Sequence, residues 1–168
     1  MILINQGFLN NPKLHRMEIP FWEANMATFY GYFKENMEAL GLPAPEGVFA
    51  NLQTATANAS TLLAYIDKYG KKVTIGELLG AGMRLEKLAT VGALSAAYYA
   101  GAVVGSIAVA GGRSLAGGVS LGEVLYRIQS RGLWRAWLVR LLHKSPEVYK
   151  TNFNARHAYR HRALRTGK

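Results

Sequence analysis

The sequence predicts an all-α protein, a bundle of five or six helices with a Gly/Ala-rich central helix or helical hairpin that is able to insert in a membrane. Three observations carry this prediction. Apolar residues recur every third or fourth position, no stretch alternates between apolar and polar residues with a period of two, and helix-start signals recur along the chain. The chain has 168 residues and no cysteine, so it is long enough for one core and has no disulfide framework.

Two helices are expected in the first half of the chain. Phe21 to Leu40 carries apolar residues at helical spacing, Pro20 suits a first helical turn, and Gly41 ends the run. A second helix is expected from about Glu46 to Tyr69, because apolar residues recur on one of its faces. That face consists of Val48, Phe49, Leu52, Ala55, Ala59, Leu62, Leu63 and Ile66.

Hydroxyl side chains mark three later helix starts. Thr74 and Glu77 have the spacing of a capping box, in which each side chain bonds the other residue's backbone N–H. Ser120 and Glu123 repeat that spacing further along the chain. Ser145, which is followed by a proline, predicts a third N-cap with proline at the first helical position.

Twenty-five consecutive residues, from Leu88 to Gly112, carry no formal charge. As one helix this stretch spans about 37 Å, whereas the hydrocarbon core of a bilayer is about 30 Å thick. Its high Ala and Gly content makes it only weakly hydrophobic for a membrane anchor. The sequence leaves two interpretations open, a helix that inserts in a membrane under some conditions and the buried core helix of a soluble bundle.

Small residues recur every fourth position in and around the uncharged stretch. Helices in lipid associate by close backbone approach along such small-xxx-small grooves. We therefore expect a membrane helix-packing surface formed by Gly76, Gly80, Ala93, Ala97, Gly101, Gly105, Ser114, Gly118 and Gly122.

The net charge of +10 lies entirely in the last quarter of the chain. Residues 1–126 contain nine basic and nine acidic side chains, whereas residues 127–168 contain eleven basic side chains and only Glu147 as an acid. This asymmetry indicates a polyanionic partner, either nucleic acid or anionic membrane lipid. We expect one compact domain with three regions: an N-terminal helical region (1–72), Gly/Ala-rich membrane-active helices (73–126) and the basic C-terminal helices (127–168).

The segment from Leu133 to Lys144 predicts an amphipathic helix, with leucines and tryptophans on one half and basic residues on the other. Trp and Arg at the edge of an apolar face are typical of an interfacial helix, in which the guanidinium meets lipid phosphate. We expect Trp134, Trp137, Arg135 and Arg140 to lie at a membrane interface. A helix that packs on its own bundle is equally consistent with this pattern.

The end of the chain interleaves aromatic and cationic side chains, a pattern that can stack on nucleic acid and neutralise it. His157 and His161 also have the spacing of two helical metal ligands, but no third ligand is evident, so we expect no metal site. The interleaved residues are Tyr149, Phe153, Arg156, His157, Tyr159, Arg160, His161, Arg162 and Arg165.

Catalytic signatures are absent from the sequence, so we expect neither an enzyme nor a cofactor. The glycine-rich run from Gly111 to Gly118 lacks the Gly-Lys-Ser/Thr ending of a phosphate-binding loop, and there is no Gly-x-Ser-x-Gly or His-Glu-x-x-His motif. A catalytic toxin that uses His143, His157 or His161 is the weakest of the possibilities.

The first residues of the chain lack the pattern of a signal peptide. The chain combines this absence with a neutral helical N-terminal part, glycine-ladder segments between Gly76 and Gly122, a basic C-terminal part and a lack of cysteine. In this combination it resembles the small pore-forming antibacterial effectors of type VI secretion, which are glycine-zipper toxins. The resemblance implies transport by the haemolysin-coregulated tube protein as carrier, a cognate immunity protein, and insertion in the inner membrane of a target cell as a homo-oligomeric pore.

The leading hypothesis is therefore a secreted antibacterial toxin, made in the cytoplasm without a signal peptide. It inserts residues Leu88 to Ala110 in the target-cell inner membrane, binds anionic lipid and conducts ions. The alternative is a soluble basic α-helical module that binds nucleic acid through residues 127–168.

Overall fold

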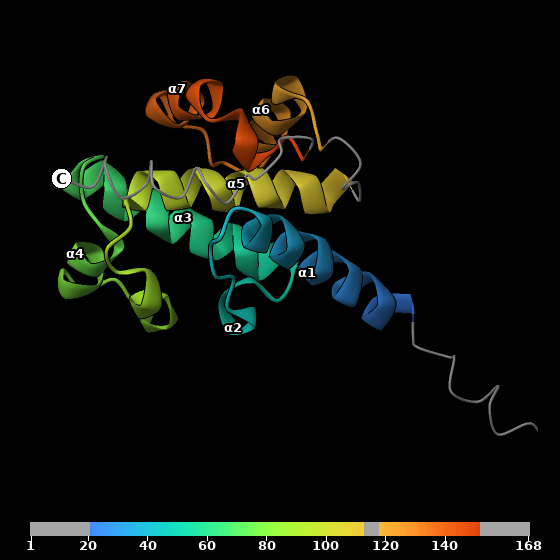
Figure 1. The fold of residues 1–168 in the computed structure, drawn as a ribbon, viewed down its shortest axis with the longest axis horizontal. Coiled ribbons are helices and arrows are strands. Elements are labelled where there is room, and N and C mark those ends of the chain that lie inside the picture. The colour runs from blue at the N-terminus through green and yellow to red at the C-terminus, as the bar shows by residue number, and fades with distance from the viewer. Residues whose placement is uncertain (1–20, 113–117, 152–168) are drawn as a thin grey trace, which may run out of the picture.

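One central helix, α5 (Ala96–Gly112), organises the fold. The computed structural model describes residues 21–112 and 118–151. Within these residues, four further helices pack around α5, two on each side (Figure 1). They are α1 (Phe21–Ala39) and α3 (Leu52–Tyr69) on one side, and α6 (Leu121–Ser130) and α7 (Ala136–Lys144) on the other.

The predicted all-α class is confirmed for the described residues. Their only strand-like feature is an isolated antiparallel bridge between Thr74 and Ser95. In this part of the chain, no helix combines the length and the apolar character needed to cross a bilayer. Shorter elements fill the connections: α2 (Glu46–Phe49), α4 (Ile75–Gly80) and two 3-10 turns, η2 (Glu86–Val91) and η3 (Pro146–Val148).

The first predicted helix is confirmed as α1, whereas the second is divided into α2 and α3. Asn51 causes the division, because its backbone is extended (φ −147°, ψ 170°). Its side-chain oxygen accepts a hydrogen bond from the Thr54 N–H at 2.9 Å, which makes it the N-cap of α3. The predicted apolar face of α3 is buried at Ala55, Ala59, Leu62, Leu63 and Ile66.

The uncharged stretch from residue 88 to residue 112 does not form one helix in this fold. Its middle pairs with the chain around the start of α4: the Ile75 N–H donates to the Leu94 carbonyl at 3.0 Å, and the Ala96 N–H donates to the Val73 carbonyl at 3.0 Å. These bonds use backbone groups that a continuous helix would need for its own ladder. The break in the predicted helix is therefore a long-range effect.

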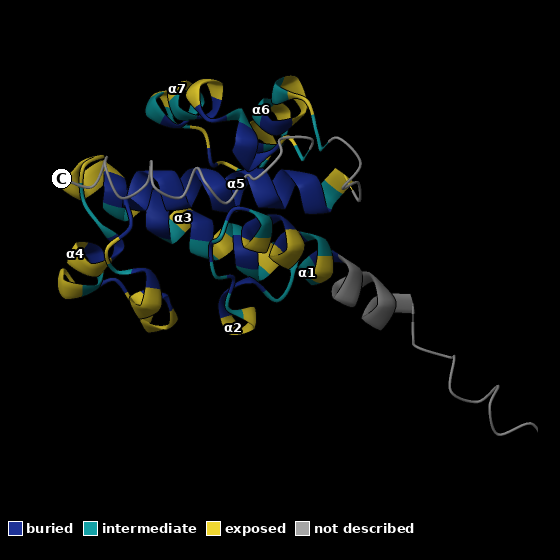
Figure 2. Cartoon of the chain, viewed as in Figure 1, coloured by how far each residue is buried: buried dark blue, intermediate teal, exposed yellow. Residues whose placement is uncertain are grey.

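α5 begins directly after this pairing. The Ser95 hydroxyl accepts a hydrogen bond from the Tyr98 N–H at 3.3 Å, as an N-cap does. From Ala96 to Ala110 every residue is buried, and α5 is accordingly dark blue along most of its length in Figure 2. A helix that is apolar around its whole circumference needs neighbours on every side, and α1, α3, α6, α7 and η3 all contact it.

The predicted helix starts at Thr74 and Ser120 are confirmed, with one difference between them. Thr74 and Glu77 form a full capping box, with bonds of 3.2 Å to the Thr74 hydroxyl and 2.7 Å to the Glu77 carboxylate. The Ser120 hydroxyl accepts from the Glu123 N–H at 3.1 Å, but the Glu123 carboxylate accepts from the arginine four residues later. Ser145 makes no capping hydrogen bond, contrary to prediction, and the proline after it begins η3.

Candidate functional site

The predicted small residues of α5 lie where α7 and η3 cross it. A Cβ atom at Gly101 would lie 2.4 Å from Cδ2 of Leu141, on α7. A Cβ atom at Gly105 would lie 2.4 Å from the carbonyl oxygen of Val148, in η3. Both distances are shorter than nonbonded contacts allow, so the lack of side chains at these two positions lets α7 and η3 approach the α5 backbone.

Several other members of the predicted helix-packing surface lie outside the contact of α5 with α7 and η3. Gly118 has a left-handed backbone (φ 74°), and a Cβ there would lie 2.1 Å from the Tyr149 carbonyl oxygen. At the start of α4, the Gly76 N–H donates to the Gly92 carbonyl at 2.9 Å. Gly80, Ala93 and Gly122 are exposed, and Ser114 lies outside the described residues.

Buried hydrogen bonds from Asn36 tie α1 to α5 and η3. The Asn36 Nδ2 donates to the Ser106 hydroxyl at 2.8 Å and to the Val148 carbonyl at 2.9 Å. Asn36 and Ser106 are both fully buried. Because three elements meet at the same carbonyl, this network holds η3 over Gly105.

The residues predicted to lie at a membrane interface belong to α7 and the turn before it. Asp67, near the end of α3, accepts hydrogen bonds from Trp137 Nε1 at 2.9 Å and from Arg135 Nε. Trp134 is 46% exposed, and Arg140 is exposed as well. The Asp67 contacts hold α7 against α3, although an ion pair this accessible to water contributes about 1 kcal/mol or less.

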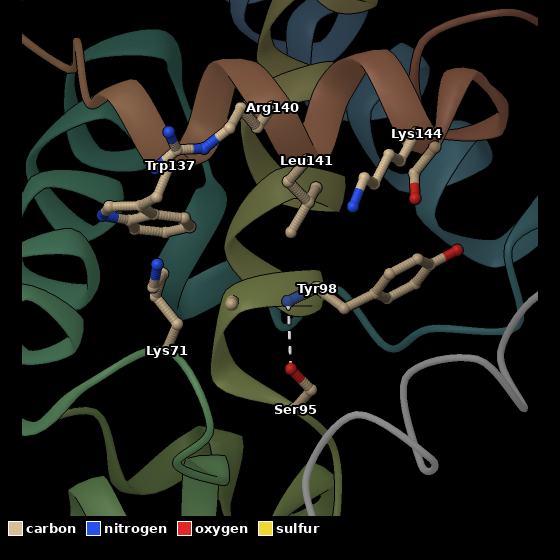
Figure 3. A pocket seen from close by; sticks show the side chains of 9 residues that line it. Lys71, Ser95, Tyr98, Trp137, Arg140, Leu141 and Lys144 are labelled. Atoms are coloured by element: carbon tan, nitrogen blue, oxygen red, sulfur yellow. Dashed lines mark hydrogen bonds between the residues drawn. The ribbon is translucent and has the colours of Figure 1, made fainter.

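A pocket of about 310 Å³ opens where α7 crosses the first half of α5 (Figure 3). Its wall is largely apolar, formed by Ala97, Leu141 and the rings of Tyr98 and Trp137. Hydroxyl and basic side chains complete the lining. They are Ser95 and Ser145, with Lys71, Arg140 and Lys144.

The charged residues that line the pocket are all cations. Lys71 comes from the loop after α3, and Arg140 and Lys144 come from successive turns of α7. In Figure 3 the amine of Lys71 points toward the Trp137 ring, and the amine of Lys144 points into the space between the Trp137 and Tyr98 rings. A concave surface with one sign of charge concentrates ligands of the opposite sign.

Two carboxylates contact the aromatic rings of the pocket without lining it. Asp67 binds the Trp137 indole, as described above. Glu147, which is 1% exposed, accepts a hydrogen bond from the Tyr98 hydroxyl at 3.1 Å. These contacts orient both rings, so that the apolar wall is formed before any ligand arrives.

Two buried phenols, Tyr99 and Tyr149, lie in and near α5. The Tyr99 hydroxyl donates to the Pro43 carbonyl at 2.8 Å, and burial raises the pKa of Tyr99 far above its usual value. Burial, followed by the charge of Glu147, also raises the pKa of Tyr149. Both phenols therefore stay neutral at physiological pH.

The pocket brings together two sets of residues that the sequence suggested separately. Ala97 belongs to the predicted helix-packing surface, and Trp137 and Arg140 belong to the predicted membrane interface. Sequence reasoning missed Lys71 and Lys144 as site residues. The sequence pattern could have indicated Lys144, because it lies one helical turn after Arg140. No local pattern places the loop that carries Lys71 beside α7.

Metal chemistry has no support from the described part of the chain, where no group of three or more His, Cys, Asp or Glu residues could hold an ion. His143 is exposed at the end of α7. His157, His161 and the other aromatic and basic residues beyond Thr151 lie outside the described residues.

Comparison of the chain with protein-family models, with curated protein sequences and with solved structures finds no match.

Proposed function

We propose that this protein is a latent membrane protein, in which α5 leaves the bundle and inserts in a membrane as part of an oligomeric, ion-conducting pore. The observation that carries the proposal is the complete burial of an uncharged helix, from Ala96 to Ala110, in a protein with a net charge of +10. Lipid can replace the neighbours of such a helix, because hydrocarbon solvates apolar side chains much as a protein core does. We call the arrangement in Figure 1 the closed fold.

By itself, α5 is short for this role. Its 17 residues span about 25 Å, less than the roughly 30 Å of a bilayer core. Residues 88–95 also carry no charge and are kept out of the helix by the backbone pairing with residues 73–76. In our proposal this pairing is released, and residues 88–112 then form one helix that is long enough to span.

α7 and η3 must move in this proposal to uncover the small-residue face of α5. α7 lies over Gly101, and η3 lies over Gly105. Their departure uncovers the small-residue face formed by Ala97 and these two glycines, along which α5 helices from separate copies can approach closely. Trp134 and Trp137 then anchor α7 at the level of the lipid headgroups.

The biological setting that we propose is attack on a competing bacterium. The protein acts as an antibacterial effector of type VI secretion, with the tube protein as carrier and an immunity protein in the producing cell. The glycine ladder, the basic C-terminal region and the enclosed apolar helix support this setting. Pore formation requires no catalytic residue, and basic residues near a bilayer favour anionic lipid by about 1 kcal/mol each.

A reversible crosslink between α5 and α7 tests the proposal. Because the chain has no cysteine, Gly101→Cys combined with Leu141→Cys introduces only these two thiols. Leu141 Cγ lies 3.7 Å from the Cβ position of Gly101, so a disulfide requires only a small shift of the side chains. We expect the oxidised variant to release little dye from phosphatidylglycerol-containing vesicles. Addition of a reductant, which cleaves the disulfide, should restore dye release.

Leu141→Cys alone, treated with the same oxidant, is the matched control, because it shortens the same side chain without forming a crosslink. Sedimentation with vesicles separates a failure to bind from a failure to insert. Equal release by the oxidised and reduced double variants would contradict opening between α5 and α7. A wild-type protein that never permeabilises anionic vesicles would contradict the pore itself.

A further inference from the structure

We infer that the pocket between α5 and α7 binds a single-chain amphiphile with a phosphate monoester head. This inference goes beyond the proposed pore, and it holds whether or not the protein enters a membrane. The site is the pocket of about 310 Å³ in Figure 3, which has an apolar wall and three cationic lining residues, Lys71, Arg140 and Lys144, that we call the rim.

The rim selects an anion. Lys71 and Arg140 reach it from different elements, Lys144 lies one turn further along α7, and no Asp or Glu lines the pocket. Ammonium and guanidinium groups make charge-assisted hydrogen bonds to phosphate, and arginine makes them in bidentate geometry. A phosphate monoester carries a charge of about −1.5 to −2 at pH 7, so it matches several cations better than a carboxylate does.

The apolar wall selects a ligand with an apolar chain attached to that phosphate head. Ala97 contributes only a methyl group, which leaves room under α7, and Leu141 covers the adjacent part of α5. The Trp137 ring is held by its hydrogen bond to Asp67 at 2.9 Å, so ligand binding costs little side-chain conformational entropy at this residue. An inorganic anion would leave this wall in contact with water, whereas an alkyl chain covers it.

Such a ligand binds the closed fold in preference to an open form. Lys71 and Arg140 line the same pocket only while α7 lies on α5 and beside the loop after α3. A ligand that binds one state selectively stabilises that state by mass action. We therefore expect the amphiphile to raise the Tm of the protein as its concentration increases.

Titration with n-octyl phosphate below its critical micelle concentration tests the site. We expect saturable binding to wild-type protein by calorimetry, together with the rise in Tm. Lys71→Gln combined with Arg140→Gln should weaken binding by about tenfold for each charge removed. Both side chains are exposed, so the double variant is expected to fold.

Lys72→Gln combined with Arg84→Gln is the matched control, because it removes the same charge from exposed residues outside the pocket. We expect this control to bind like wild type, and inorganic phosphate and octyl glucoside to bind far more weakly than octyl phosphate.

Three outcomes would overturn the inference: equal affinity of the pocket variant and the control variant, equal affinity for octyl glucoside and octyl phosphate, or tighter binding of octanoate than of octyl phosphate. No membrane is present in this titration, so its result is independent of pore formation.

Discussion

The carbonyl oxygen of Val148 lies 2.4 Å from the position that a Cβ atom of Gly105 would occupy. The same oxygen accepts a hydrogen bond from Asn36 at 2.9 Å, so it cannot move away without losing that bond. The glycine therefore has a role in the closed fold, where it admits η3 to the surface of α5. A small-residue ladder is thus used for packing within the bundle, besides the role that we propose for it in lipid.

Alanine substitutions at three glycines should have different effects on stability. Gly105→Ala is expected to lower the free energy of unfolding by about 1–3 kcal/mol, because it meets backbone atoms. Gly101→Ala should cost less, since the atom it meets is the end of the flexible Leu141 side chain. Gly31→Ala, exposed in α1 with nothing within 4 Å, should raise stability by about 0.5–1 kcal/mol.

Urea denaturation of the three variants measures these differences. Similar effects of the substitutions at residues 31 and 105 would contradict the close contact between η3 and α5.

Loss of the buried amide of Asn36 should be costly. Asn36→Ala leaves the Ser106 hydroxyl and the Val148 carbonyl without this donor, for an expected loss of about 2–4 kcal/mol. Ser106→Ala should cost less, because Asn36 retains its bond to the carbonyl. In a double-mutant cycle we expect a coupling of about 1 kcal/mol between the two side chains, and additive effects would argue against their hydrogen bond.

Stability should depend on pH through Tyr99 in the alkaline range. Its pKa is raised by burial in the folded state and is about 10 in the unfolded chain. Below pH 10 the phenol is protonated in both states, so its contribution is fully present. Above pH 10 only the unfolded chain releases the proton readily, so stability falls as the pH rises toward the folded-state pKa.

Tyr99→Phe is expected to make this alkaline loss shallower. It should also cost about 1 kcal/mol at pH 7, because it removes the hydrogen bond to Pro43. Denaturant midpoints between pH 7 and pH 11 measure both effects, and identical slopes for the two proteins would count against a buried phenol at this position.

The contact between Asp67 and α7 should matter more for the pocket than for stability. Asp67→Ala removes the partner of the Trp137 indole and of Arg135, but the Asp67 side chain is 37% exposed, so the loss of stability should be about 1 kcal/mol or less. Because the indole then loses its fixed orientation, binding of octyl phosphate should weaken a few-fold. An unchanged affinity would show that this hydrogen bond does not position the ring.

Features that depend on neighbouring residues were predicted well from the sequence. The helical class, the start of α1, the buried face of α3 and the N-caps at Thr74 and Ser120 all follow from patterns within one or two helical turns. The division at Asn51 was missed, because the apolar spacing continues across it. Only the extended backbone of Asn51 and its bond to Thr54 reveal a second helix start.

Features that depend on distant residues could not be predicted in the same way. The end of the uncharged helix at residue 96 results from hydrogen bonds to residues 73–76, and no local pattern encodes that pairing. The pocket likewise requires Lys71 and Arg140, which are far apart in the sequence, to line the same space.

The amino-acid order alone determined that this chain is helical, carries one long uncharged segment and concentrates its positive charge near the C-terminus. Only the tertiary structure decided what covers the uncharged segment: α7 and η3 pack against Gly101 and Gly105, and together with α1, α3 and α6 they enclose α5. The physical reason is that small apolar residues fit equally well against a protein neighbour and against another helix in lipid, so their spacing alone does not name the partner.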